Sequence, residues 1–313
     1  IQRPVRGIHV DEEKTLWVAT KGNGIFRIFD YESDRSPAES RKSTLTASNS
    51  ELGSNAVYCF AESSRPLLWI GEEEGLCCYS YTDRKVIKVP VYVDGLDFKY
   101  IHDIYETGDG ELWMASVGMG VARAKISGPP DAPPVLTDVE RYVINKGELG
   151  SNYFFSIYAE SDSLVLFANK GYGAFRYNPA TDGIEPLSDM KFDNMTLNSI
   201  LDINRDSSGN WLLGTSYGLV KYDSDTTYTL FNSHNGFPNS TIHAIIKSGP
   251  DDFWLSTNLG LVNFDSKENS FRTYGYNDGL GVIEFSDGAS FYDSVDGTVY
   301  FGGINGFASI SAD

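Results

Sequence analysis

The four histidines are the first residues in which to look for catalysis or metal binding. His9, His102, His234 and His243 are far apart along the chain, and three of them fall at similar places in short apolar segments. Imidazole suits acid–base chemistry, and three converging rings would suit a metal such as Zn²⁺. No local ligand spacing supports such a site, so we interpret these histidines as hydrogen-bonded structural residues. The sequence therefore predicts no metal and no cofactor.

Other catalytic arrangements have no better support. The chain contains 43 Asp and Glu residues, so some carboxylate pair always fits the separation that a glycosidase needs. The turns TGDGELW (107–113) and RDSSGNW (205–211) lack the spacing of the Ser-x-Asp-x-Gly turn of sialidases. No nucleophile elbow or phosphate-binding glycine loop occurs. We therefore predict that this chain has no catalytic residues and is not an enzyme.

The charge balance excludes further classes of function. With 25 Lys and Arg against 43 Asp and Glu, the formal net charge is −18. Nucleic-acid binding needs clustered cations, and binding at a membrane surface needs a basic or amphipathic face. No apolar run approaches the roughly 20 residues that span a bilayer. We expect neither a nucleic-acid partner nor direct membrane insertion for this chain.

A repeat organises the whole chain and must position any functional residue. LWVATKGNGIFRI around Trp17 recurs as LWIGEEEGLCCY around Trp69 and LWMASVGMGVARA around Trp113. Every copy has a glycine five to seven residues after its anchor, and the anchors are 43 to 53 residues apart. The seven anchor positions are Trp17, Trp69, Trp113, Leu166, Trp211, Trp254 and Tyr300.

The pattern of each repeat unit predicts four short strands separated by turn residues. Apolar runs such as VYCFAE (57–62) and IHAIIK (242–247) precede the anchor strand, and two further strands follow the glycine. Units of 40 to 50 residues with four strands are typical of propeller blades. We predict an all-β, seven-bladed β-propeller with four antiparallel strands per blade, its tryptophans packed between blades. The predicted blades are 1–50, 51–95, 96–147, 148–193, 194–235, 236–277 and 278–313.

The repeat motif resembles the two-component regulator propeller of periplasmic sensors in Bacteroidetes. The features that carry the resemblance are the Asp/Gly turn, Leu-Trp, small residues, Gly-Leu and an aromatic residue, and they extend over residues 5 to 311. The opening RPVRGIHVDEEKTLWVATKGNGIF and the ending VYFGGINGFASI are similar to those of the second, C-terminal propeller of such sensors. The resemblance implies a periplasmic position in a parent histidine kinase anchored in the inner membrane, with a companion propeller and an immunoglobulin-like domain.

One set of loops is the predicted place of contact with a ligand or partner. The loop between the second and third strands of a blade emerges on the same face as the connection between blades. Tyrosine, lysine and asparagine side chains suit a glycan, because they hydrogen-bond hydroxyls and cover the apolar side of a sugar ring. Local turn formation is an alternative role for such asparagines. The predicted contact residues are Tyr100, Tyr153, Lys170, Tyr172, Tyr217, Lys21, Asn23, Asn258 and Asn305.

Two principal functions follow from these residues and from the resemblance. The first is a sensing domain of a hybrid two-component system that recognises an oligosaccharide released by polysaccharide utilisation and relays its binding to membrane-proximal domains. The second is a docking propeller that packs against a partner propeller or a second copy, with the ligand site elsewhere. A propeller lyase or glycoside hydrolase is the third and least favoured alternative. The negative charge favours a neutral sugar, although Lys21 and Lys170 could locally favour an acidic one.

Overall fold

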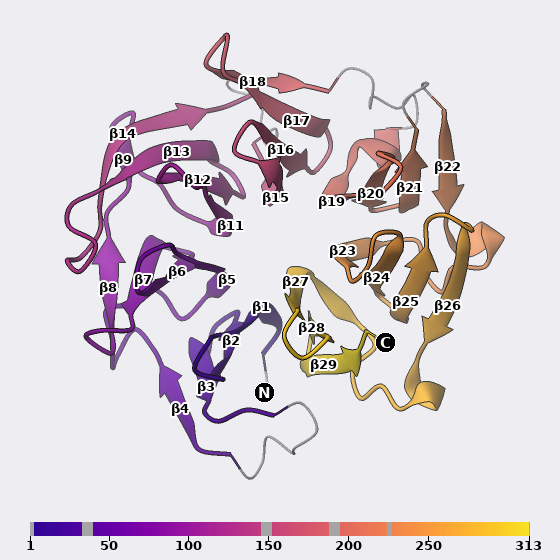
Figure 1. Ribbon diagram of the computed structural model, residues 1–313, viewed down its shortest axis with the longest axis horizontal. Helices are drawn as coiled ribbons and strands as arrows, with labels where there is room; N and C mark the ends of the chain where they lie inside the picture. The colour runs from indigo at the N-terminus through magenta and orange to yellow at the C-terminus, as the bar shows by residue number, and fades with distance from the viewer. Residues whose placement is uncertain (1–2, 33–39, 145–151, 188–194, 224–226, 313) are drawn as a thin grey trace.

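The protein is a ring of seven antiparallel β-sheets around a central channel (Figure 1). The computed structural model describes residues 3–32, 40–144, 152–187, 195–223 and 227–312. Six sheets have four strands, and the seventh has three strands within the described residues. These residues contain no α-helix. The predicted seven-bladed, all-β propeller is confirmed, although only six blades show the full set of four strands. The predicted blade limits at 147/148 and 193/194 lie outside the described residues.

Each blade takes its strands consecutively from the chain. The first blade contains β1 (Val5–Val10), β2 (Leu16–Thr20), β3 (Ile25–Ile28) and β4 (Lys42–Leu45). The second contains β5 (Val57–Glu62), β6 (Leu67–Glu72), β7 (Gly75–Ser80) and β8 (Lys85–Val89). The third contains β11 (Ile101–Glu106), β12 (Glu111–Ser116), β13 (Gly120–Ser127) and β14 (Val135–Tyr142). The fourth blade contains β15 (Phe154–Ser161), β16 (Leu164–Asn169), β17 (Gly173–Asn178) and β18 (Gly183–Pro186). The fifth contains β19 (Ile200–Arg205), β20 (Trp211–Thr215), β21 (Gly218–Tyr222) and β22 (Tyr228–Phe231).

The last two blades and the connecting elements complete the chain. The sixth blade contains β23 (Ile242–Lys247), β24 (Asp252–Thr257), β25 (Gly260–Asp265) and β26 (Ser270–Tyr274), and the seventh contains β27 (Phe285–Asp293), β28 (Thr298–Gly303) and β29 (Gly306–Ser311). The connections contain a small hairpin of β9 (Tyr92–Val93) and β10 (Leu96–Asp97) and the 3-10 helices η2 (Met195–Asn198), η3 (Ser233–Asn235) and η4 (Tyr276–Asp278).

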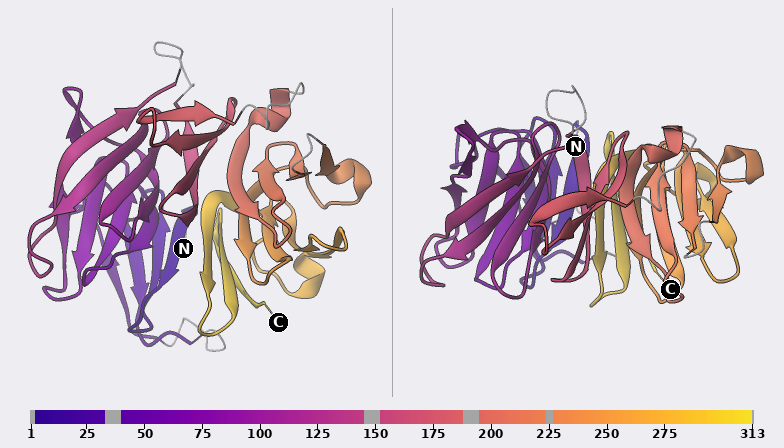
Figure 2. Two further views of the ribbon diagram at one scale, coloured as in Figure 1. Left: turned by 45° about the horizontal axis from the view of Figure 1, so that its top comes forward. Right: turned by 90° about the horizontal axis from the view of Figure 1, so that it is seen from above.

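The alternation of strand directions gives the ring two different faces. Strands within a blade are antiparallel, so the first and third strands both begin on one face and end on the other. We call the face on which they begin the rim face; it carries the second-to-third strand loops and the connections between blades. The opposite face, which carries the first-to-second strand turns, is the turn face. The two ends of the chain accordingly lie on opposite faces of the disc (Figure 2).

The repeated glycine is required where the second-to-third strand loop meets the outermost strand. Gly260 has φ 113°, a backbone conformation that side chains rarely adopt. A Cβ atom at this position would collide with the carbonyl oxygen of Tyr274 in β26. The glycine therefore lets the loop turn tightly against the neighbouring strand, which explains its recurrence in every repeat.

Four of the five tryptophans pack into the interfaces between blades. The exposed fraction is 1% for Trp17 and Trp113, 0% for Trp69 and 3% for Trp254. Trp69 lies in a buried cluster with Met114 of the following blade, and its indole nitrogen donates a 2.6 Å hydrogen bond to Glu106. Each of these indoles thus joins one blade to the next through apolar area.

Trp211 differs from the other tryptophans. Leu212, not Trp211, occupies the register position that Trp17 has in the first blade. Side chains alternate along a strand, so Trp211 points to the opposite side, where its ring lies 5.4 Å from that of Tyr158 in the preceding blade. It is also partly exposed. The prediction that Trp211 is an anchor like the others is therefore wrong. Gly218 lies seven positions after Trp211. In the other blades with a two-residue loop between the second and third strands, the glycine lies six positions after the anchor.

The ring closes between its first and last blades by side-chain packing. Val5 and Ile8 of β1 share a buried cluster with Tyr300 of β28. No described strand pairs β1 with the seventh sheet. Closure between the segments near 1–12 and 282–311 was predicted, and the structure shows it as apolar packing together with an ion pair of 3.0 Å between Lys14 and Asp296.

Candidate functional site at the centre of the ring

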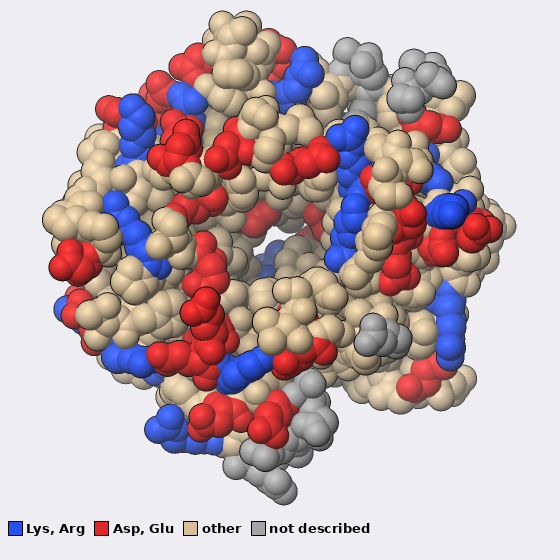
Figure 3. Space-filling model, viewed as in Figure 1, with Lys and Arg blue, Asp and Glu red and all other residues tan. Residues whose placement is uncertain are grey.

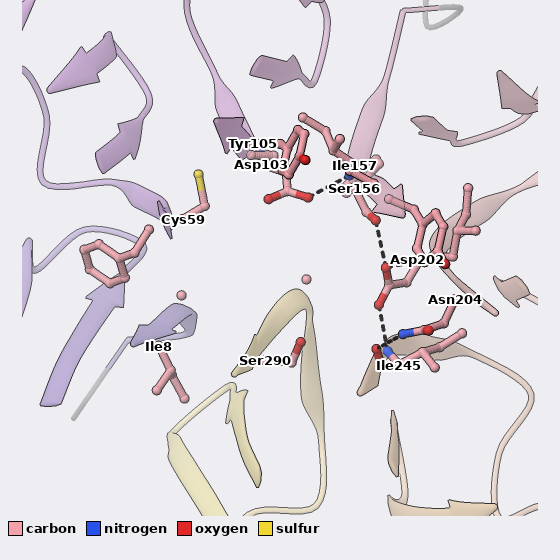
Figure 4. A pocket seen from close by; sticks show the side chains of 18 residues that line it. Ile8, Cys59, Asp103, Tyr105, Ser156, Ile157, Asp202, Asn204, Ile245 and Ser290 are labelled. Atoms are coloured by element: carbon pink, nitrogen blue, oxygen red, sulfur yellow. Dashed lines mark hydrogen bonds between the residues drawn. The ribbon is translucent and has the colours of Figure 1, made fainter. Parts of the chain in front are cut away.

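The seven first strands enclose a central cavity of about 370 Å³ (Figure 4). Every blade contributes to its lining, from Gly7 in β1 to Ser290 in β27. Its volume falls in the range of roughly 300–1,000 Å³ that is usual for small-molecule sites. The cavity is therefore the candidate binding site of the described chain.

A bulge near the start of the first strands shapes the wall of this cavity. The pairing register shifts between Ile101 and Asp103, and again between Phe154 and Ser156. Such a bulge redirects one side chain without breaking the sheet. The residues skipped by these two shifts, His102 and Phe155, both line the cavity.

Two half-buried carboxyl groups join neighbouring blades in the cavity wall. Asp103 accepts a 2.7 Å hydrogen bond from the backbone nitrogen of Ile157 in the next blade. Asp202 accepts equivalent bonds of 2.7 Å from Ser156 on one side and from the backbone nitrogen of Ile245 on the other (Figure 4). These bonds connect the third, fourth, fifth and sixth blades in series.

Burial dominates the protonation of both carboxyl groups. It raises the pKa of Asp103 to about 7, and the nearby charge of Asp202 acts in the same direction. Burial also raises the pKa of Asp202 to about 6, against the opposing effect of the hydrogen bond from Ser156. The cavity wall therefore carries less negative charge near neutral pH than its composition indicates.

His102 is held in place by aromatic rings but lacks hydrogen-bond partners. Its ring stacks on Tyr58 with centroids 4.0 Å apart and meets the edge of Phe155 at 5.6 Å. Both ring nitrogens are buried, and neither has a partner among the described residues. Burial, together with the charges of Arg6 and Lys21, lowers the pKa of His102 to about 3, so the imidazole is neutral.

The predicted structural role of the histidines is thus correct for two of them and wrong for His102. His9 bonds Glu62 at 2.7 Å. His243 bonds Asp287 at 2.5 Å and Asn258 at 2.7 Å. An unpartnered buried imidazole costs free energy, and both ring nitrogens of His102 are covered by surrounding atoms and are not open to the cavity.

The structure places the predicted contact residues on the rim face. Backbone bonds connect their loops: the nitrogen of Lys170 donates to the carbonyl of Tyr153 at 3.0 Å, and Lys21 bridges Ala56 of the second blade. Lys21 and Asn23 lie between β2 and β3, Lys170 and Tyr172 between β16 and β17, Tyr217 between β20 and β21, Asn258 between β24 and β25, and Asn305 between β28 and β29, while Tyr100 and Tyr153 precede β11 and β15.

These residues are not equally accessible. Tyr100 and Tyr153 are 41% and 36% exposed. Tyr172 and Tyr217 are partly buried and pack against blade cores, so they also serve the ring. The side chain of Asn258 is held by His243. The exposed tyrosines are consequently the better candidates for contact with a ligand.

Tyr100 also adopts an unusual backbone conformation. Its φ of 56° lies in the left-handed region, which is uncommon for a bulky residue and costs of order 1–3 kcal/mol. Its backbone joins two loops, because its nitrogen donates to Glu73 and its carbonyl accepts from Val117. These two bonds hold the backbone of an exposed aromatic residue on the rim face.

Sequence reasoning did not identify the cavity residues. His102, Asp103 and Asp202 were indistinguishable from other residues of their types, because their partners belong to neighbouring blades. Among the described residues no group of three or more His, Cys, Asp and Glu side chains could hold a metal ion. Within the same residues, no helix is long and apolar enough to cross a membrane.

Comparison with known proteins shows what the chain is similar to. No family model matches it. It is 24% identical over 324 aligned residues to histidine kinase P4 of Formosa agariphila, covering 99% of this chain and 22% of that protein. The chain thus spans about a fifth of the length of this curated relative.

Solved structures share the fold over the whole chain. The extracellular domains of two hybrid two component systems from B. thetaiotaomicron superpose with TM-scores of 0.78 and 0.76, at 24% and 18% identity. They cover 100% and 99% of this chain, which spans 39% and 40% of theirs. A streptogramin B lyase also superposes, with a TM-score of 0.71 and 16% identity over 99% of this chain and 94% of that one. The fold is therefore shared by sensor domains and by an enzyme, and it does not by itself decide the function.

Proposed function

We propose that the chain is the ligand-sensing propeller of a hybrid two-component sensor and binds an oligosaccharide on its rim face. The observation that carries this proposal is the pair of exposed tyrosines, Tyr100 and Tyr153, each two residues before a residue that lines the central cavity. Neither tyrosine belongs to a blade core, so the ring does not account for them. Tyrosine rings cover the apolar side of a sugar, and their hydroxyls bond its polar side.

The similar proteins support the sensing role. Extracellular domains of hybrid two component systems share the fold over the whole chain, and a histidine kinase shares its sequence at a low level. For the parent protein we propose a periplasmic position of this propeller, a companion propeller, an immunoglobulin-like domain and a histidine kinase. The chain itself then acts by binding rather than by catalysis.

Sensing on this basis is a shift between arrangements that exist before the ligand binds. An oligosaccharide that binds one arrangement of the propellers more tightly favours that arrangement by its difference in affinity. A shift from 1:99 to 99:1 needs a difference of about 10⁴-fold. A ligand held between the rim face and a partner domain meets this requirement best, because its contacts change when the domains move.

A docking role is the second candidate, and one observation favours it. Leu259 and Ile304 on second-to-third strand loops are 53% and 44% exposed. Apolar side chains on the same face as Tyr100 and Tyr153 suit contact with a second propeller or a second copy of the chain. Both roles use the rim face, so the position of the surface does not distinguish them. Sugar binding by the isolated chain does, because only the sensing role requires it.

Thermal unfolding of the purified chain with neutral and acidic oligosaccharides tests the proposal. A ligand present at about 100 times its Kd stabilises the folded chain by about 2.7 kcal/mol and raises its Tm. A raised Tm without product formation supports sensing. Products detected by chromatography would instead show an enzyme, and no shift with any oligosaccharide would favour docking.

A double variant then locates the site. We expect Tyr100→Ala with Tyr153→Ala to keep the fold and to weaken oligosaccharide binding at least about tenfold, or 1.4 kcal/mol. Tyr228→Ala is the matched control, because Tyr228 is 44% exposed on the outermost strand β22. Unchanged affinity in the double variant would place the site away from the rim face.

A further inference from the structure

Three cations lie around the mouth of the cavity on the rim face. Arg6 immediately precedes Gly7, which lines the cavity. The ammonium of Lys170 lies 5.6 Å from the ring centroid of Phe155, another lining residue. Lys21 is exposed in the rim-face loop between β2 and β3, where its backbone pairs with Ala56 of the second blade. Arg6 and Lys21 belong to the first blade and Lys170 to the fourth.

These cations are not neutralised by ion pairs. Within the described part of the chain, other Lys and Arg residues such as Lys14, Lys99 and Arg123 pair with carboxylates. No such pair involves Arg6, Lys21 or Lys170. Lys21 and Lys170 are also exposed, whereas Arg6 is half-buried. Three unpaired cations converge on one opening in a chain whose net charge is −18.

The carboxylates that face this mouth already have partners. Asp287 bonds His243 at 2.5 Å. Burial opposes the ionisation of Asp287, but this hydrogen bond and the charges of Arg6 and Lys170 lower its pKa. Glu73 accepts a 2.8 Å hydrogen bond from Ser54. Asp103 and Asp202 lie in the cavity wall and hold their protons more strongly than ordinary aspartates. Asp287 thus carries a negative charge near Arg6 and Lys170, but its described ion pair is with His243 and leaves the donors of both cations unoccupied.

The other mouth of the channel has a mixed character. Figure 3 looks onto the turn face, where acidic side chains line much of the opening and a group of basic side chains lies on its right-hand side. Turns between first and second strands contribute acidic residues to this face, including Glu12, Glu13, Asp109, Asp162 and Asp296. These carboxylates oppose the approach of an anion from the turn face, where Arg205 and Lys247 also end their strands.

We propose that the rim-face mouth is an anion subsite that receives the carboxylate or sulfate group of an acidic sugar. The anion binds Arg6, Lys21 and Lys170, and the sugar ring enters toward His102. This proposal rests on the proposed function and specifies its substrate class. It replaces the expectation from net charge that a neutral sugar is favoured, because short-range contacts outweigh a field that salt screens within about 8 Å.

Each group has a defined task in this subsite. The guanidinium of Arg6 can donate two parallel hydrogen bonds to an oxyanion, and the two ammonium groups add charge. The neutral imidazole of His102 has one donor and one acceptor nitrogen. Both of these nitrogens are covered by surrounding atoms, so the sugar packs beside the imidazole and does not bond to it. Phe155 offers an apolar ring to the sugar beside the ammonium of Lys170.

Acidic monosaccharides test the subsite with the purified chain. Isothermal titration would use D-glucuronate, D-galacturonate and D-galactose 4-sulfate, with D-glucose and D-galactose as neutral counterparts. We expect at least one acidic sugar to bind saturably, at least about tenfold tighter than its neutral counterpart and more weakly at higher salt. The uronates and the sulfate ester distinguish the two sources of the anion. Equal affinity for acidic and neutral sugars, or no binding of any acidic sugar, would overturn the proposal.

Charge-neutral variants locate the binding. Arg6→Gln and Lys170→Gln should each weaken the acidic sugar about tenfold. Lys85→Gln, which changes an exposed lysine on the outer strand β8, should not. Equal losses in all three variants would show a general charge effect and refute the subsite. Should a variant fail to fold, the imidazole nitrogen resonances of His102 in the unmodified chain remain a direct probe. They should shift on saturation, and unchanged resonances would count against the subsite.

The outcomes separate this proposal from the proposed function. If neutral oligosaccharides bind and the Arg6 and Lys170 variants leave that binding unchanged, sensing stands and the anion subsite fails. If no sugar of either class binds the isolated chain, the proposed function fails as well.

Discussion

Replacing Asp103 by Asn should remove a large part of the pH dependence of folding. Burial raises the pKa of this carboxyl from 3.8 to about 7. Between these values the folded chain holds a proton that the unfolded chain has lost, so stability is highest at low pH and falls as pH rises through about 7. From about pH 5 to pH 7 the loss covers two units at 1.36 kcal/mol each, or about 2.7 kcal/mol.

The variant separates this titration from all others. An asparagine at position 103 cannot ionise, and its single side-chain oxygen can accept from only one of the two backbone nitrogens that Asp103 serves, those of Ile104 and Ile157. We therefore expect a loss of about 1–3 kcal/mol that is the same at every pH. On top of this constant cost, the fall in stability with rising pH should become smaller by about 2.7 kcal/mol.

Urea unfolding at about pH 5 and about pH 8 measures both effects. The difference between the two free energies of unfolding should be about 2.7 kcal/mol smaller in Asp103→Asn than in the unsubstituted chain. Asp131→Asn is the control, because Asp131 is exposed in the turn between β13 and β14. A pH dependence that is equal in the Asp103 variant and the unsubstituted chain would refute the claim that this carboxyl is protonated in the fold. Asp202 contributes separately, since burial raises its pKa to about 6.

Two further substitutions test how the blades are held. Trp69→Ala should cost about 3–5 kcal/mol in urea unfolding, because it leaves a cavity between two blades and removes the donor to Glu106; near-native stability would contradict the packing role. Gly260→Ala should lose about 1–3 kcal/mol through backbone strain and collision with the carbonyl of Tyr274. Gly281→Ala, where nothing lies within 4 Å of the new Cβ, should change the Tm little.

The fold could be predicted because its determinants repeat along the chain. A glycine after each anchor and apolar runs around it are local features, and seven copies support one another. The same repetition identified the loops that share the rim face. The repeat gave a wrong prediction at Trp211, whose indole lies one residue before the true anchor position. Leu212 occupies that position in the strand pairing.

The central site could not be predicted because its contacts cross between blades. Arg6, Lys21 and Lys170 are up to 164 residues apart in the chain, yet they surround one mouth. Asp103 was one of 43 acidic residues until its bond to Ile157 in the next blade was seen. His102 differs from His243 only in lacking partners, which depends on neighbouring strands rather than on its own segment.

Ring closure without a shared sheet has a consequence for the order of the sequence. Every blade is a continuous stretch of chain, and among the described residues side chains hold the seam between β1 and the seventh sheet, whereas other seams also have backbone bonds such as that between Gly22 and Asn55. A sheet built from both ends of the chain would fix where the ring must open; here the order of blades is cyclic and has no structurally privileged first member. The chain could be opened between β22 and β23 and rejoined across the old seam by a linker that crosses the disc. A first strand of six residues is about 20 Å long, so the linker needs about six extended residues or more. The same seven blades would then assemble from a permuted sequence.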